Sequence, residues 1–165
     1  MQANTHTKLP VKFPQYAFST EENRDAFRFT SVGPKGEIKK IVLYSRTGIN
    51  NVYNLAFGDY NGHNDDLDDL SVSDNRDTQK ILATIASTFL VFIENHPKAW
   101  VLAEGSTKAR TRLYRIGISQ NLTDISSEFA IFGYMDPGGW QPFNKNTDYM
   151  RFMITSKQNL QHYED

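Results

Sequence analysis

A broad apolar stripe between residues 75 and 95 constrains the fold of this chain more than any other feature. Its members recur every three or four residues, which is the spacing of one helix face. They are Ile81, Leu82, Ile85, Phe89, Phe92 and Ile93. We predict a helix over about residues 75–95, with Asp74 as the N-cap and His96-Pro97 at its end. Because so wide an apolar face must be buried, this is expected to be the main core helix.

Short segments bounded by turn signals predict a β-sheet around that helix. The predicted strands or extended segments are Lys12–Ser19, Ala26–Val32, Glu37–Ser45, Val52–Gly58, Ala99–Ala103, Glu128–Met135 and Tyr149–Thr155. Gly33-Pro-Lys-Gly36 joins two of them as a hairpin. We therefore predict an α+β fold, with a mostly antiparallel sheet of six to seven strands and two main helices packed on one face. The length suits a single domain, 1–165, with loose polar tails at about 1–10 and 158–165.

A strand, a glycine turn and a helix start follow one another directly after the core helix. Ala99–Ala103 is a short apolar run, Gly105 breaks it, and Ser106 or Thr107 can cap the next helix. A helix start offers unpaired backbone N–H groups and the positive end of the helix dipole, which attract anions. The later strand Glu128–Met135 allows a β-α-β crossover over this unit.

The helix after Gly105 has three faces on a helical wheel. One face, which is predicted to pack inward, carries Ala109, Leu113 and Ile116. The second carries Lys108, Arg112 and Arg115, and the third carries Arg110, Tyr114 and Ile118. A further helical turn is predicted over Leu122–Ser127.

Arg110 is set apart from the other cations, where its guanidinium can fork onto a phosphate or a carboxylate. The candidate ligand-binding residues are Gly105, Ser106, Thr107, Lys108, Arg110, Arg112 and Tyr114. Two alternatives stay open. The second face can be a solvated helix surface, as runs of charge usually are, and Arg110 can form an internal ion pair with an acidic loop.

That acidic loop covers residues 59–74 and is rich in Asp, Asn, Gly and Ser. Its carboxylates at 59, 65, 66, 68 and 69 are of the type that binds Mg²⁺ or Ca²⁺, but the spacing is not that of an EF-hand. Clustered Asp residues in a loop are most often solvated. We therefore predict no metal and no other cofactor, with Asp59, Asp65 and Asp66 as weak candidates for metal ligands.

The composition removes several classes of site. The absence of cysteine excludes disulfides, thiolate zinc sites and cysteine nucleophiles, and it suits a reducing cytoplasm. No segment has the apolar length of a signal peptide core or a membrane span, so a cytoplasmic protein without membrane contact is expected. No phosphate-binding or hydrolase motif of the common kinds occurs. The formal net charge of −1 favours neither nucleic acid nor membrane as a partner.

Several strings in the chain resemble a family of small bacterial proteins that is known only as a domain of unknown function. They are Asn54-Leu-Ala-Phe-Gly-Asp59, Asp65-Asp66, Asp77, Leu82-Ala-Thr84, Gly105-Ser-Thr107 and Arg110-Thr-Arg-Leu-Tyr114. The resemblance covers most of residues 13–135. It implies a bacterial cytoplasmic protein and carries across no activity, cofactor or catalytic residue.

Three functions are compatible with these patterns. The first is a binding module for a phosphate-bearing ligand such as a nucleotide or nucleic acid. Trp140, Phe143, Tyr149 and Phe152 are candidate stacking surfaces for bases, although core packing is the commoner role of such residues. The second is a protein-binding role, for example in a toxin–antitoxin or phage-defence pair. The third is an enzyme, a transferase or nuclease acting on a nucleotide or nucleic acid, that uses Arg110 with Asp59 or Asp65.

Overall fold

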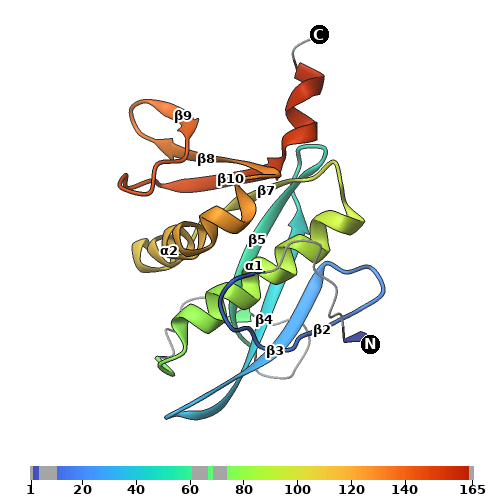
Figure 1. Cartoon of the computed structure of the whole chain (residues 1–165), viewed down its shortest axis with the longest axis vertical. Helices are drawn as coiled ribbons and strands as arrows, with labels where there is room; N and C mark the ends of the chain where they lie inside the picture. The colour runs from blue at the N-terminus through green and yellow to red at the C-terminus, as the bar shows by residue number, and fades with distance from the viewer. Residues whose placement is uncertain (1, 4–10, 61–66, 69–73, 164–165) are drawn as a thin grey trace.

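The computed structural model describes residues 2–3, 11–60, 67–68 and 74–163 (Figure 1). The strands are β1 (Gln2–Ala3), β2 (Ser19–Thr20), β3 (Ala26–Gly33), β4 (Gly36–Arg46), β5 (Val52–Tyr60), β6 (Leu67–Asp68), β7 (Trp100–Ala103), β8 (Phe129–Met135), β9 (Gly139–Pro142) and β10 (Arg151–Ser156). The helices are α1 (Thr78–Asn95), α2 (Lys108–Ile125) and the 3-10 helix η1 (Lys157–Tyr163). The predicted α+β class is confirmed.

All the strands belong to one sheet, in the order β1-β2-β3-β4-β5-β7-β10-β8-β9, with β6 beside β5. Every neighbouring pair is antiparallel except β5 and β7, which α1 connects. Helix α2 connects β7 to β8, and β10 lies between these two strands. The predicted count of six to seven strands is too low, because the described residues form ten. The extra strands are β1 and β6, of two residues each, and β9, which lies in a segment predicted to be a loop. Of the predicted segment Lys12–Ser19, only Ser19 lies in a strand, the two-residue β2.

Both long helices pack on the same face of the sheet, as predicted. Tyr53 and Phe57 of β5 share that face, because alternate side chains of a strand point the same way. The Tyr53 ring contacts Phe92 of α1, with 5.0 Å between ring centroids. The Phe57 ring contacts Tyr114 of α2 at 6.0 Å. Figure 1 shows α1 crossing in front of β4 and β5, with α2 below β10.

Helix α1 is the core helix that the apolar stripe predicts. Phe92 is fully buried, and its ring stacks on that of Tyr44 at 4.2 Å between centroids. Burial raises the pKa of Tyr44, so its hydroxyl stays protonated and shares a 2.9 Å hydrogen bond with Thr88. The helix begins later than predicted, because Asp77 and not Asp74 is the N-cap.

Helix α2 is one continuous helix to Ile125, and its inward face differs from the predicted one. The buried residues are Arg110, Tyr114, Ile118, Asn121 and Ile125. Of the predicted inward face, Leu113 packs against the core, whereas Ala109 is exposed and Ile116 is 38% exposed. The prediction is therefore wrong for Ala109 and Ile116. Arginine can bury its long apolar stem and tyrosine its ring. Here Arg110 and Tyr114 turn inward, and most of the predicted aliphatic face does not.

The C-terminal segment is more ordered than the predicted loose tail. Residues 157–163 form η1, and hydrogen bonds of Asn159 hold this helix against the sheet. The Asn159 amide donates hydrogen bonds to the Pro97 carbonyl at 3.0 Å and to Thr155 Oγ1 at 2.9 Å. At the other end, Gln2–Ala3 pair with β2, and the rest of the predicted tail 1–10 lies outside the described residues. None of the described helices has the length and apolar character needed to cross a membrane.

Candidate functional site

The start of α2 is built as the sequence predicts. Thr107 is the N-cap, and its side-chain oxygen accepts a 3.2 Å hydrogen bond from the Arg110 N–H. The Gly105 N–H donates to the Thr111 hydroxyl at 3.1 Å, which folds the turn against the first helical residues. The earliest N–H groups of a helix have no partner within the helix itself. The turn therefore presents donors at the beginning of α2.

A surface groove of about 550 Å³ opens at this turn. It is lined by Glu104, Gly105, Ser106, Thr107, Lys108, Thr111, Arg112, Arg115, Asp148, Tyr149 and Met150. Arg115 forms an ion pair with Asp148 at 2.5 Å. Within the part of the chain that the structure describes, Lys108 and Arg112 form no ion pair and both are exposed. The groove therefore has two cations that are available to a ligand.

Arg110 and Tyr114 do not belong to this groove. Arg110 is only 4% exposed, and its Cζ lies 4.6 Å from the centroid of the Phe57 ring. The buried Tyr114 hydroxyl donates a long hydrogen bond of 3.5 Å to the Leu55 carbonyl. The structure thus separates the seven predicted ligand-binding residues. Five of them, Gly105, Ser106, Thr107, Lys108 and Arg112, line the groove, whereas Arg110 and Tyr114 face β5.

Of the acidic candidates, Asp59 lies on β5 and does not line the groove. Asp59 follows Phe57 on the same face of β5 and forms a salt bridge with Lys40 of β4, a buried residue that lies directly opposite. Asp65 and Asp66 lie outside the described residues. Among the residues that are described, no group of three or more His, Asp or Glu side chains is placed to hold a metal ion.

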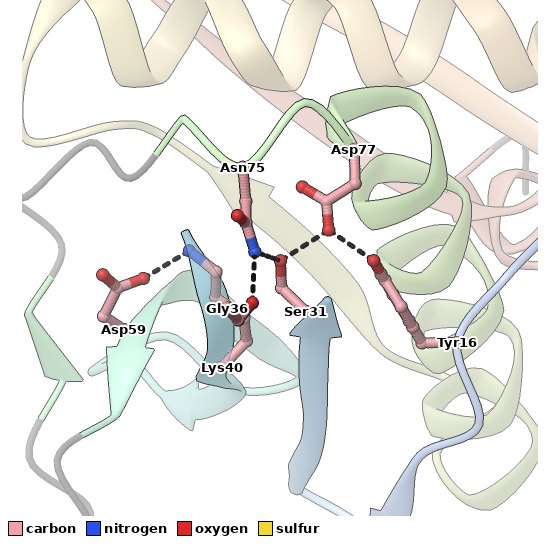
Figure 2. A network of polar contacts seen from close by, with 7 residues as sticks. All are labelled: Tyr16, Ser31, Gly36, Lys40, Asp59, Asn75 and Asp77. Atoms are coloured by element: carbon pink, nitrogen blue, oxygen red, sulfur yellow. Dashed lines mark hydrogen bonds and ion pairs between the residues drawn. The ribbon is translucent and has the colours of Figure 1, made fainter. Parts of the chain in front are cut away.

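A network of polar side chains, shown in Figure 2, adjoins this ion pair at the start of α1. The Asp77 carboxylate accepts hydrogen bonds of 2.5 Å from the hydroxyls of Tyr16 and Ser31. The Asn75 amide donates to Ser31 Oγ and to the Gly36 carbonyl, both at 3.0 Å. Burial, followed by the hydrogen bond to Asp77, raises the pKa of the Tyr16 hydroxyl. The network ties the N-terminal segment and the β3–β4 hairpin to the first turn of α1.

Sequence reasoning did not identify Tyr16, Ser31, Lys40 or Asn75. One signal was available, since Ser31 and Lys40 are polar residues at positions whose alternation places them on the helix-facing side of β3 and β4. Of the four proposed stacking aromatics, Tyr149 and Phe152 are core residues and Phe143 packs against the core. Phe143, Tyr149 and Phe152 form one cluster with ring centroids 5.7–6.0 Å apart.

Replacing Gly105 by alanine is expected to lower the free energy of unfolding by about 1–3 kcal/mol, the usual cost of overpacking. A Cβ atom here would lie 2.3 Å from the Arg110 Cβ and 2.4 Å from the Thr111 backbone nitrogen. Urea unfolding measures the change, and Gly48→Ala is the matched control because a Cβ at Gly48 meets nothing within 4 Å. An equal loss in the two variants would contradict this account of the turn.

Two of the strings that carried the family resemblance, residues 54–59 and 110–114, meet in space, because Arg110 and Tyr114 both contact Phe57. A search of curated proteins and a search of solved structures each found no match to the chain. The model of a family of unknown function, DUF6934, matches residues 12–157. The chain therefore belongs to this family of unknown function.

Proposed function

We propose that this protein binds a phosphate-bearing ligand in the groove at the start of α2. The observation that supports the proposal is the pair of exposed cations, Lys108 and Arg112, which have no carboxylate partner in the described part of the chain. They line a groove together with Ser106, Thr107 and Thr111. Hydrogen bonds between charged partners are roughly twice as strong as neutral ones, and arginine can bind a phosphate through two N–H groups.

The groove suits an exchanging ligand better than the Arg110 region does. Arg110 and Lys40 are at most 4% exposed, so a ligand that reached them would have to displace packed side chains. An enzyme that uses Arg110 with Asp59 needs that displacement, whereas binding in the groove needs none. We therefore favour a binding module over the transferase or nuclease.

The test is the double substitution Lys108→Ala/Arg112→Ala, with inorganic tripolyphosphate as the probe and calorimetry at low salt as the measurement. We expect the dissociation constant to rise about tenfold or more, because charged hydrogen bonds contribute roughly 1.5–3 kcal/mol each. Binding by the unmodified protein should also weaken steeply as salt is added, since bound phosphates release counterions.

Lys98→Ala is the matched control for this experiment. Lys98 is an exposed cation in the turn before β7, so the whole of that strand separates it from the groove. The Lys98→Ala substitution should leave tripolyphosphate binding unchanged. If the unmodified protein does not bind tripolyphosphate at low salt, or if Lys98→Ala weakens binding as much as the double substitution, the proposal fails.

A further inference from the structure

An aromatic platform lies on the opposite face of the sheet from the helices, on the three strands β8, β9 and β10. Tyr134 is directly opposite Trp140 on one side and Arg151 on the other. The Tyr134 and Trp140 rings meet edge to face at 5.3 Å, and the Arg151 Cζ lies 4.6 Å from the Tyr134 ring centroid. Trp140 is 43% exposed. Its ring is therefore held in place by a neighbour and still offers surface to a ligand.

The platform is continuous with the groove at the start of α2. Arg151 Nε lies 3.8 Å from the carboxylate of Glu104, which lines the groove. Met150 also lines the groove, and its N–H donates a 2.8 Å hydrogen bond to the Tyr134 carbonyl. Met150 is itself 47% exposed. Glu104 and Met150, which line the groove with Lys108 and Arg112, are therefore linked through Arg151 and Tyr134 to Trp140.

We propose that the ligand of this combined surface is a single-stranded nucleic acid, with its phosphates in the groove and a base stacked on Trp140. This inference rests on the proposed function and names the ligand class of that site. Nucleic acid carries phosphates and aromatic rings in alternation along one chain, which matches a cation-lined groove beside an aromatic platform. Stacking on an aromatic side chain accepts any base but requires the base to be unpaired.

A protein partner is the competing occupant, because Trp, Tyr and Arg are also enriched at protein interfaces. A protein partner would explain the composition of the platform but not that of the groove. The exposed cations Lys108 and Arg112 of the adjoining groove add a requirement for negative charge. A nucleic-acid strand meets both requirements with one repeating unit. The observations therefore favour nucleic acid.

The experiment uses a Trp100→Phe variant, which leaves Trp140 as the only tryptophan of the chain. It is titrated at low salt with an oligothymidylate of about 12 nucleotides, a typical site length, and with an abasic oligomer of equal length. Oligothymidylate should quench the Trp140 fluorescence. The abasic oligomer should bind about fivefold to a hundredfold more weakly, the range expected for the loss of one stacked base.

Substitutions at position 140 supply the second measurement. Trp140→Ala should weaken oligothymidylate binding by the same factor and leave tripolyphosphate binding unchanged, whereas Trp140→Phe should retain most of the affinity. Melting temperatures check that each variant folds. The comparison of the two oligomers keeps Trp140 in place, so it tests the inference even if a variant at position 140 does not fold.

The outcomes separate the two proposals. If both oligomers bind equally and the Trp140 fluorescence does not change, the platform is not a base-stacking surface, and the phosphate-binding proposal stands. If neither oligomer nor tripolyphosphate binds, both proposals fail. Retention of a host protein by the parent but not by Trp140→Ala, without any binding of oligomers, would assign the platform to a protein partner and overturn the inference.

Discussion

Replacement of Phe92 by alanine is expected to lower the free energy of unfolding by about 3–5 kcal/mol. Phe92 is fully buried in the last turn of α1, and its ring contacts Tyr44, Tyr53 and His96 at centroid distances of 4.2, 5.0 and 4.4 Å. The substitution removes all three ring contacts and leaves a cavity between α1 and the sheet, which a rigid sheet cannot close. Urea unfolding followed by circular dichroism measures the change, and the melting temperature should fall by on the order of 10 °C.

Ile116→Ala on α2 is a useful control for this measurement. Ile116 lies on the face that the sequence predicted to pack inward, but the structure leaves it 38% exposed. Surface substitutions usually change stability by less than about 0.5 kcal/mol. A loss of several kcal/mol for Ile116→Ala would mean that α2 is rotated from the orientation described above, and a small loss for Phe92→Ala would mean that α1 is not the core helix.

Most of the fold could be predicted from the sequence because it depends on short-range periodicity. The stripe of α1 and the alternation in β3, β4, β5, β8 and β10 each follow from the geometry of one element. The glycine turn at Gly105 and the cap at Thr107 follow from local backbone chemistry. These predictions needed no knowledge of distant residues.

The parts that could not be predicted depend on contacts between distant segments. The two-residue strands carry no alternation, and they form only because a neighbouring strand supplies hydrogen bonds. The inward face of α2 was missed because hydrophobicity alone places arginine outside, whereas Phe57 of β5 offers Arg110 a ring to cover. The hydrogen bonds of Asp77 could not be predicted either, because its partners Tyr16 and Ser31 lie 61 and 46 residues away in the sequence.

The candidate site was predicted in its residue types but not in its grouping. A helical wheel separated Lys108 and Arg112 from Arg110 correctly. It could not show that Arg110 faces the sheet, because that requires the position of β5. As a result, the residues that the sequence predicted as one site are divided between two regions of the structure. One is the open groove, and the other is the polar region around Lys40 and Asp59.

Replacement of Lys40 by methionine is expected to cost about 1–3 kcal/mol of unfolding free energy, because it removes the salt bridge and leaves a carboxylate that is only partly buried. The Lys40 side chain is 4% exposed and that of Asp59 is 24% exposed. Methionine keeps the apolar stem that packs beside Phe29, the residue opposite Lys40 on β3, but leaves the Asp59 carboxylate without its lysine. Urea unfolding of Lys40→Met, Asp59→Leu and the double variant forms a thermodynamic cycle.

The double variant should be more stable than the sum of the single losses predicts, because replacing both ions with apolar groups leaves neither charge without the other. Simple additivity would show that the two side chains are not coupled. Tripolyphosphate binding by Lys40→Met then distinguishes the two regions of the candidate site. Since Lys40 does not line the groove, folded Lys40→Met protein should bind as tightly as the parent. A loss of tripolyphosphate binding at unchanged stability would indicate that the ligand binds in the Asp59 region. It would then support the hypothesis of an enzyme that uses Arg110 with Asp59.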